Sequence, residues 1–135
     1  MAGYSGAPLP KKLGIKDGHR VAFVEAPDGF ARMLGALPDG AEVKSRLRGP
    51  LDVIVFFTTS RAKLAKRLDT LRRAMAQDGR LWIAWPKKAS TVPTDMTEDV
   101  VRDVALPTGL VDNKVAAIDE TWSGLQLVIR LEHRT

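Results

Sequence analysis

The sequence predicts an α/β fold in which a mostly parallel sheet of about six strands lies between two layers of helices. Three successive segments carry this prediction: an apolar strand over residues 52–57, an amphipathic helix over residues 61–77 and a second apolar strand over residues 80–85. A strand, a crossover helix and another fully apolar strand form a βαβ unit, whose strands are parallel and buried on both faces. The centre of the sheet is therefore covered by helices on each side.

The segments before this unit extend the sheet and add a helix. Residues 20–24 are a nearly continuous apolar run after a turn signal, which indicates a buried strand. Residues 41–47 alternate in places and carry three charges, which is typical of a strand near the sheet edge. Between them, helical spacing predicts a short helix with a buried stripe of Phe30, Met33, Leu34 and Leu37.

The segments after the central unit predict one more helix and a hairpin. Asp95 and Glu98 have capping-box spacing, which predicts Asp95 as the N-cap of a helix. The buried face of that helix is expected to comprise Val100, Val101 and Val104. Two apolar runs, residues 114–118 and 125–131, then predict an antiparallel hairpin that closes one edge of the sheet.

The order of these elements predicts where a ligand would bind. Right-handed crossovers place the strands at residues 20–24 and 52–57 side by side at the centre, and the chain reverses direction between them. Open α/β sheets bind ligands at such a switch point, outside the carboxyl ends of the strands. Here those ends are residues 25–29, 58–60 and 86–90.

The length and composition indicate one globular domain. The 135 residues suffice for a single core, which we expect over residues 13–135 after an N-terminal arm of residues 1–12. No cysteine is present, which excludes disulfides and thiol catalysis. We find no signal peptide and no run of apolar residues long enough to span a membrane, so a cytoplasmic location without membrane association is expected.

The net charge of +5 suggests attraction to anions. Much of the excess lies on the helix predicted over residues 61–77, which has six basic side chains and a single acidic one. A solvated outer helix face explains this pattern most simply. A nucleic-acid partner is disfavoured because no aromatic stacking platform or reading motif accompanies the charges.

The loop after residue 85 contains the strongest candidate for anion binding. Two ammonium groups, nearby hydroxyls and the start of the following helix could together hold a phosphate or carboxylate, although a capping Asp95 would compete for the helix end. A surface loop with solvated lysines is the alternative. The candidate ligand-binding residues at the three strand ends are Glu25, Pro27, Asp28, Gly29, Thr58, Trp85, Lys87, Lys88, Ser90 and Asp95.

Trp122 is a separate candidate for interaction. It lies in the predicted hairpin connection, where an indole could stack on a planar ligand or pack on a partner, or fold back over the sheet edge. The two histidines have no metal-ligand spacing, and no nucleophile lies in a recognised pattern. We therefore predict no metal site and no catalytic residue.

Laid end to end, the elements resemble the core of class I methyltransferases. Residues 13–21 resemble the approach to that family's first strand, residues 51–55 its fourth strand and residues 78–83 its fifth, and the final two strands resemble its terminal hairpin. The resemblance implies a Rossmann-like fold, in the form of a reduced methyltransferase core.

The cofactor-binding turn of that family is where the sequence departs from it. Such enzymes carry Gly-x-Gly-x-Gly after the first strand, so that backbone can approach S-adenosylmethionine without a Cβ in the way. Glu25-Ala26-Pro27-Asp28-Gly29 keeps only the last glycine, and Phe23 replaces the usual acidic residue of the strand. Arg46 and Arg48 stand near the position of the ribose-binding carboxylate. These departures disfavour S-adenosylmethionine-dependent transfer, so no cofactor is predicted.

Several specific strings resemble a bacterial family of uncharacterised proteins, the domain of unknown function DUF3052. That resemblance implies a fold and a bacterial cytoplasmic setting, and no activity. The strings are Tyr4-Ser5-Gly6 and residues 11–16, 85–90, 94–99, 109–115 and 119–125.

Three functions of different classes remain open. The sequence favours a non-catalytic Rossmann-like protein that acts as a protein-interaction or self-association module, with a second copy or another protein as partner. The alternative is a binder of a small anionic metabolite or nucleotide at the carboxyl ends of the strands. A divergent enzyme, with Glu25, Asp28, Lys87 and Asp95 converging in the cleft, is less favoured, because a fold alone does not establish a function.

Overall fold

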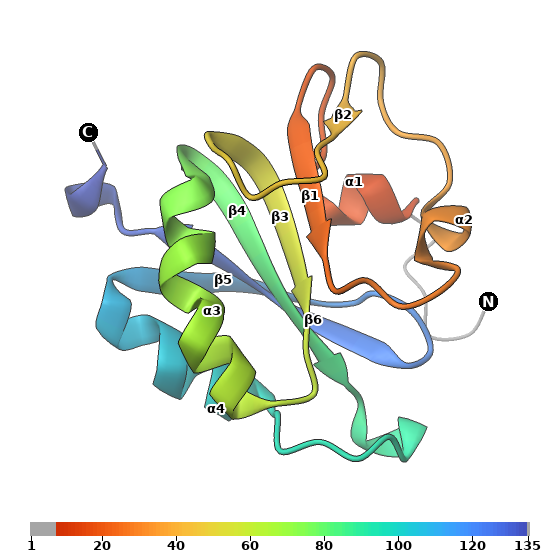
Figure 1. The fold of residues 1–135 in the computed structure, drawn as a ribbon, viewed down its shortest axis with the longest axis vertical. Coiled ribbons are helices and arrows are strands. Elements are labelled where there is room, and N and C mark those ends of the chain that lie inside the picture. The colour runs from red at the N-terminus through yellow and green to blue at the C-terminus, as the bar shows by residue number, and fades with distance from the viewer. Residues whose placement is uncertain (1–7, 135) are drawn as a thin grey trace.

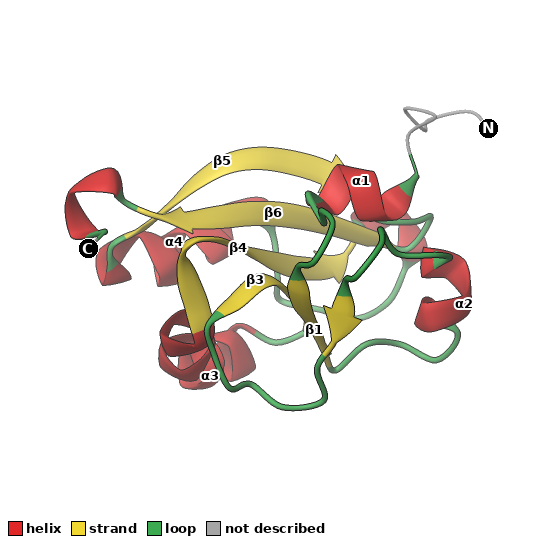
Figure 2. Cartoon of the chain, turned by 90° about the horizontal axis from the view of Figure 1, so that it is seen from above, coloured by secondary structure: helices red, strands yellow, loops and turns green. Residues whose placement is uncertain are grey.

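In the computed structural model, residues 8–134 are described, and they form a six-stranded mixed sheet with helices on both faces (Figures 1 and 2). The strand order is β2-β1-β3-β4-β6-β5. Residues 1–7 of the predicted arm lie outside the described part of the chain. The strands are β1 (Arg20–Val24), β2 (Glu42–Val43), β3 (Leu51–Phe57), β4 (Met75–Pro86), β5 (Leu110–Ala117) and β6 (Trp122–Ile129). The α-helices are α1 (Leu9–Leu13), α2 (Phe30–Leu34), α3 (Arg61–Ala74) and α4 (Glu98–Ala105), and the short 3₁₀ helices are η1 (Lys88–Ser90), η2 (Leu106–Thr108) and η3 (Leu131–His133).

The pairing of the strands confirms the predicted fold class. Strand β1 pairs in parallel with both β2 and β3, and β3 pairs in parallel with β4. Strand β6 pairs antiparallel with β4 and with β5, so the predicted hairpin closes the sheet. The switch point expected between β1 and β3 is therefore present.

Alternate side chains of the central strands point into two separate cores. On β3, Ile54 and Phe56 pack with the apolar seam of α3 and with α4, whereas Val53, Val55 and Phe57 pack on the side of α1 and α2. All five are at most 2% exposed. Because successive strand residues point to opposite faces, one apolar strand supplies both cores.

The helix after β3 is three residues shorter than predicted. Helix α3 ends at Ala74, and β4 starts at Met75, which pairs with Leu51. Residues that local propensity assigns to the helix are therefore part of the sheet. Asp78-Gly79 is part of β4 rather than the end of the helix, and a Cβ on Gly79 would lie 2.9 Å from the Leu51 carbonyl oxygen, so the close approach of two strands requires this glycine.

The helix predicted after the strand at residues 20–24 and the edge strand predicted over residues 41–47 are both shorter in the structure. Helix α2 ends at Leu34, since Gly35 adopts a positive φ of 78°, and Met33 is 40% exposed rather than buried. Only Glu42–Val43 of the expected strand over residues 41–47 pairs with β1. The hairpin strands are also shifted, so that Trp122 begins β6 instead of lying in the turn.

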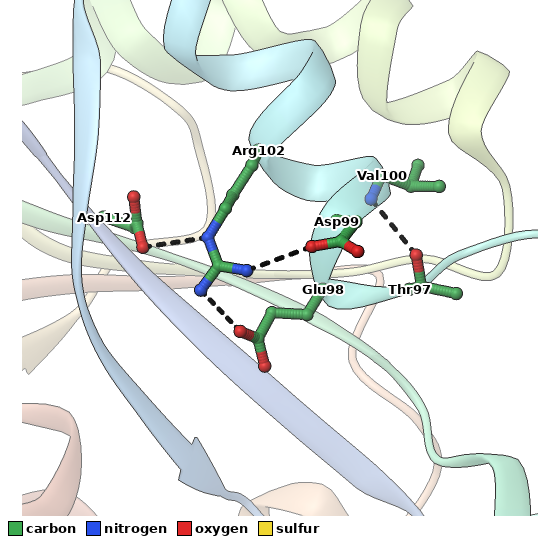
Figure 3. Close-up of polar contacts among 6 residues, drawn as sticks. All are labelled: Thr97, Glu98, Asp99, Val100, Arg102 and Asp112. Atoms are coloured by element: carbon green, nitrogen blue, oxygen red, sulfur yellow. Dashed lines mark hydrogen bonds and ion pairs between the residues drawn. The ribbon is translucent and has the colours of Figure 1, made fainter.

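The capping prediction for α4 was wrong. Thr97, not Asp95, is the N-cap, and its hydroxyl accepts a hydrogen bond from the backbone N–H of Val100 at 3.1 Å (Figure 3). Asp95 instead accepts a hydrogen bond from the backbone N–H of Arg61 at 2.8 Å, at the start of α3. Of the three valines that were expected to be buried, Val101 is buried, and Val100 and Val104 are half-buried.

Arg102 fastens α4 to β5 (Figure 3). Its Nε donates a hydrogen bond to Asp112 on β5 at 3.0 Å, and its two terminal nitrogens contact Glu98 at 2.5 Å and Asp99 at 3.3 Å. The hydrogen bonds to Asp112 and then Glu98 raise the pKa of Arg102 above its ordinary value. This guanidinium therefore stays charged and structural.

A hydrogen bond from a buried indole connects α1 to the centre of the sheet. The indole Nε1 of Trp82, which is fully buried, donates to the backbone carbonyl of Leu13 at 3.0 Å. Gly14, with φ of 83°, ends the helix in the left-handed conformation and leaves that carbonyl facing the sheet.

We predict that Trp82→Phe lowers the free energy of unfolding by about 1–2 kcal/mol more than Trp85→Phe does, because it leaves the Leu13 carbonyl buried without a donor. Trp85 is a matched control, since it is 7% exposed and its indole donates no hydrogen bond in residues 8–134. Urea denaturation measures both losses. Equal losses would mean that the indole hydrogen bond does not stabilise the fold.

Candidate functional site

A cavity of about 380 Å³ lies at the carboxyl ends of β1 and β3, against the first two turns of α3. We call it the basic cavity, because three cations of α3 line it. Its position coincides with the switch point of the sheet. The lining residues are Glu25, Phe56, Phe57, Thr58, Thr59, Lys63, Lys66, Arg67 and Trp122.

The turn from β3 into α3 builds the floor of the basic cavity. The hydroxyl of buried Thr58 accepts a hydrogen bond from the Ser60 backbone N–H at 3.1 Å, and the Thr58 backbone N–H donates to Ala84 on β4 at 3.0 Å. The Ser60 side chain caps α3 by accepting from the Lys63 N–H at 3.2 Å, as its sequence position indicates. With Asp95 on the Arg61 N–H, three N–H groups at this helix start, those of Ser60, Arg61 and Lys63, already have acceptors.

The three cations lie on one face of α3 and have no carboxylate partner. Lys63, Lys66 and Arg67 are spaced i, i+3 and i+4, which puts them on the same side of the helix. No ion pair involves any of the three within residues 8–134. By contrast, Arg61 pairs with Asp103 and Arg73 pairs with Asp69, outside the cavity.

The side chain of Arg67 is held by the wall of the cavity. Its guanidinium carbon lies 5.5 Å from the centroid of the Phe56 ring, a cation–π contact, and the residue is half-buried. A guanidinium held against a ring keeps its donors available in a defined direction, which suits two-point binding of phosphate or carboxylate.

Glu25 is the only carboxylate that lines the basic cavity. The backbone of Glu25 adopts a φ of 58°. Between residues 8 and 134, only one other non-glycine residue has a positive φ. Such a conformation is uncommon for a residue with a Cβ and often occurs at functional sites. Glu25 also takes part in no ion pair with the three cations, so it does not neutralise them.

A second cavity, of about 240 Å³, shares Trp122 with the basic cavity. Trp122 packs edge-on against Phe57, with ring centroids 5.2 Å apart. Phe30 lines this second cavity and packs on Phe57 at 4.9 Å and on Phe23 at 5.0 Å, so a chain of aromatic rings supports its wall. The lining residues are Pro27, Asp28, Gly29, Phe30, Met33, Asp119, Thr121 and Trp122.

The structure divides the residues expected at the ligand site. Glu25, Thr58 and Trp122 line the basic cavity, while Pro27, Asp28 and Gly29 line the second one with Trp122. The others lie elsewhere. Trp85 is buried in the core, Asp95 caps α3, and Lys87, Lys88 and Ser90 line neither cavity.

Hydrogen bonds to backbone carbonyls occupy two polar groups of the loop after β4, whereas the ammonium groups of Lys87 and Lys88 form no ion pair within residues 8–134, so the anion site expected there stays a prediction. The Ser90 hydroxyl donates to the Lys87 carbonyl at 2.6 Å, and the Lys87 N–H donates to the Thr121 carbonyl at 2.8 Å. The cations of α3, which line the basic cavity, were not among the ligand-binding residues predicted from the sequence. Their i, i+3, i+4 spacing directly after a switch-point strand was the available signal.

Two further observations concern the described residues, 8–134. Among them, no group of three histidine, aspartate or glutamate side chains is arranged to hold a metal ion. No helix in this part of the chain has both the length and the apolar character needed to cross a bilayer.

Several solved structures with a similar fold are methyltransferases. A SAM-dependent methyltransferase from Aquifex aeolicus superposes with a TM-score of 0.63 and 20% identity, over 88% of this chain and 87% of that one. A putative type 11 methyltransferase from Sulfolobus solfataricus gives a TM-score of 0.67 and 16% identity, over 94% and 92%. A TehB-like SAM-dependent methyltransferase from Corynebacterium glutamicum gives a TM-score of 0.57 and 13% identity, over 96% of this chain and 91% of that one. At these identities the likeness establishes a methyltransferase-like, Rossmann-like fold. No family model and no curated protein matches the sequence.

We predict that acrylamide quenches only the fluorescence of Trp122 in the folded protein, because Trp82 and Trp85 are 0% and 7% exposed whereas Trp122 is half-buried at the two cavities. The Trp122→Phe variant should lose the quenchable component, and Trp85→Phe should keep it. Unchanged quenching in Trp122→Phe would contradict the placement of this indole at the cavities.

Proposed function

We propose that this protein binds a small anionic ligand in the basic cavity. The observation that supports this most is the absence of carboxylate partners for Lys63, Lys66 and Arg67 within residues 8–134, although other basic residues of the same helix have them. Like charges on one helix face repel each other, which destabilises the helix slightly. An anion placed between them removes this repulsion and gains charge-assisted hydrogen bonds.

The chemistry of the cavity favours a phosphate or carboxylate group. Two ammonium groups and a guanidinium provide the donors, and the exposed Thr59 at the mouth adds a hydroxyl. The helix start provides little, since Ser60 and Asp95 already accept from its N–H groups. Side-chain charge, rather than the helix terminus, therefore binds the anion.

S-adenosylmethionine, the cofactor that the fold family implies, does not fit these residues. In the turn after β1 the backbone of Glu25 is already in a left-handed conformation with a side chain at the cavity, and Pro27 lines the second cavity where a glycine-rich turn would leave room. The three cations would also repel a sulfonium. We accordingly derive no methyl-transfer step.

Binding without catalysis is the proposed role. Glu25 is the single carboxylate and no histidine lines the basic cavity, so neither a carboxylate pair nor a histidine base is present there. Lys87 and Asp95, which the enzyme hypothesis required in the cleft, do not line either cavity. The resemblance to DUF3052, which rests on the strings of residues given above, implies no activity and is compatible with this role.

We predict that pyrophosphate at about 100 times its Kd stabilises the protein by about 2.7 kcal/mol and raises its Tm by several degrees. The Lys63→Gln, Lys66→Gln double variant should lose most of this shift because it removes two of the three donors. Thermal unfolding with and without pyrophosphate measures it, and the shift should shrink as salt increases.

The matched control is Lys87→Gln with Lys88→Gln, which removes the same two charges outside the cavity and should keep the full shift. Equal losses in both double variants would show only a net-charge effect and would contradict the proposed site. A shift with S-adenosylmethionine would contradict the fit argument above.

Self-association through β5 is a second candidate, supported by the exposed edge of the sheet. Strand β5 ends the strand order, and Val115 on it is 48% exposed. If two copies pair antiparallel about Asn113, Asp112 lies opposite Lys114 of the partner subunit, which is a favourable cross-strand pair. The register shift between Asp112 and Lys114 interrupts this edge, a feature that discourages edge pairing, so we rank this candidate second.

For this second candidate we expect a concentration-dependent dimer in size-exclusion chromatography with light scattering, and a monomer for Val115→Lys. Val43→Lys on the opposite edge strand β2 is the control and should still dimerise, since Val43 is 55% exposed there. A wild-type protein that remains monomeric at all concentrations would exclude this candidate.

A further inference from the structure

We infer that the anionic ligand is a nucleotide, with its phosphate in the basic cavity and its base in the second cavity against Trp122. This inference rests on the proposed function, because it names the ligand class for the same site. Trp122 lines both cavities, which are therefore neighbours, and the inferred ligand reaches past this indole from one to the other.

The indole of Trp122 is held in place before any ligand binds. Its ring packs edge-on against Phe57 at 5.2 Å. Its backbone N–H donates to Asp119 Oδ1 at 2.7 Å, and its carbonyl accepts from Ile118 at 2.9 Å. A rigid, half-buried indole loses little entropy on binding, which makes it a good surface for a flat ring.

Part of the wall of the second cavity is apolar and suited to a planar ring. Besides Trp122, Pro27, Phe30 and Met33 line it, and Phe30 is supported by Phe23 and Phe57. Met33 is 40% exposed, although the sequence pattern would bury it, and a thioether packs favourably on aromatic rings. A base inserted here would cover apolar surface that is otherwise in water.

The charges of the two cavities determine the orientation of the ligand. Asp28 has no hydrogen bond or ion pair with residues 8–134, and Asp119 uses only Oδ1, for the N–H groups of Thr121 and Trp122. These carboxylates would repel a phosphate from the second cavity, while the cations of α3 attract it to the basic one. The polarity of a nucleotide matches this asymmetry.

The same carboxylates discriminate among bases. A carboxylate only accepts hydrogen bonds, so it favours a ring edge with adjacent N–H donors, as guanine presents with its ring N–H and amino group. Uracil presents its N–H between two carbonyl oxygens, which a carboxylate repels. The site should therefore prefer guanine to uracil.

Isothermal titration of the full chain with ribose 5-phosphate, uridine monophosphate and guanosine monophosphate tests the inference. Guanosine monophosphate should bind at least about tenfold more tightly than ribose 5-phosphate, as expected for one base on an aromatic side chain. Trp122→Leu should reduce the guanosine monophosphate affinity to near that of ribose 5-phosphate, and it should weaken guanosine monophosphate binding by a larger factor than ribose 5-phosphate binding, because Trp122 also borders the basic cavity.

The carboxylates are tested by Asp28→Asn with Asp119→Asn, which should abolish the preference for guanosine over uridine monophosphate. The asparagine that replaces Asp119 keeps an acceptor oxygen for the two N–H groups of the turn. The control is Asp39→Asn with Asp78→Asn, two exposed positions in neither cavity, which should keep the preference.

The outcomes separate this inference from the proposed function. If all three ligands bind equally in the wild-type protein, the base has no subsite and the nucleotide inference is wrong, while anion binding stands. If none of the three binds and pyrophosphate gives no shift either, the proposed function itself is wrong. If Trp122→Leu keeps the advantage of guanosine monophosphate, the base does not lie on this indole.

Discussion

The burial of β3 on both faces is the constraint on which the rest of the structure depends. Val53, Val55 and Phe57 fill one core, and Ile54 and Phe56 fill the other, with every one of these side chains removed from water. A strand buried in this way has to be paired on both edges, because each of its backbone groups needs a partner. The parallel pairing with β1 and β4 satisfies that need and aligns the carboxyl ends of all three strands.

That alignment determines where charge collects. Helix α3 leaves the carboxyl end of β3, and its apolar seam of Leu64, Leu68 and Leu71 must face the sheet. The helix can then rotate no further, so the face with Lys63 and Lys66 borders the strand ends. A core requirement thus places cations beside the switch point.

The sequence was informative where the signal is local or where burial is unambiguous. The apolar runs of β1, β3 and β4 and the seam of α3 predict the fold class and the switch point, because their periodicity reflects burial directly. Element ends were less accurate. Met75 pairs with Leu51, so α3 ends earlier than predicted. Asp95 was predicted to cap the helix that follows it, whereas its carboxylate caps α3 at Arg61, thirty-four residues earlier in the chain. Such long-range hydrogen bonds leave no trace in local spacing.

By itself, then, the sequence determined a mostly parallel α/β sheet, its central strands and the position of its switch point. Tertiary structure alone decided which side chains meet at that switch point. Lys87 and Lys88, the cations nearest to a strand end in the sequence, lie outside both cavities, whereas Trp122, from the far hairpin, joins Glu25 and the cations of α3. The physical reason is that strand order, not chain order, sets which ends are neighbours, and β6 reaches the site only by pairing antiparallel with β4.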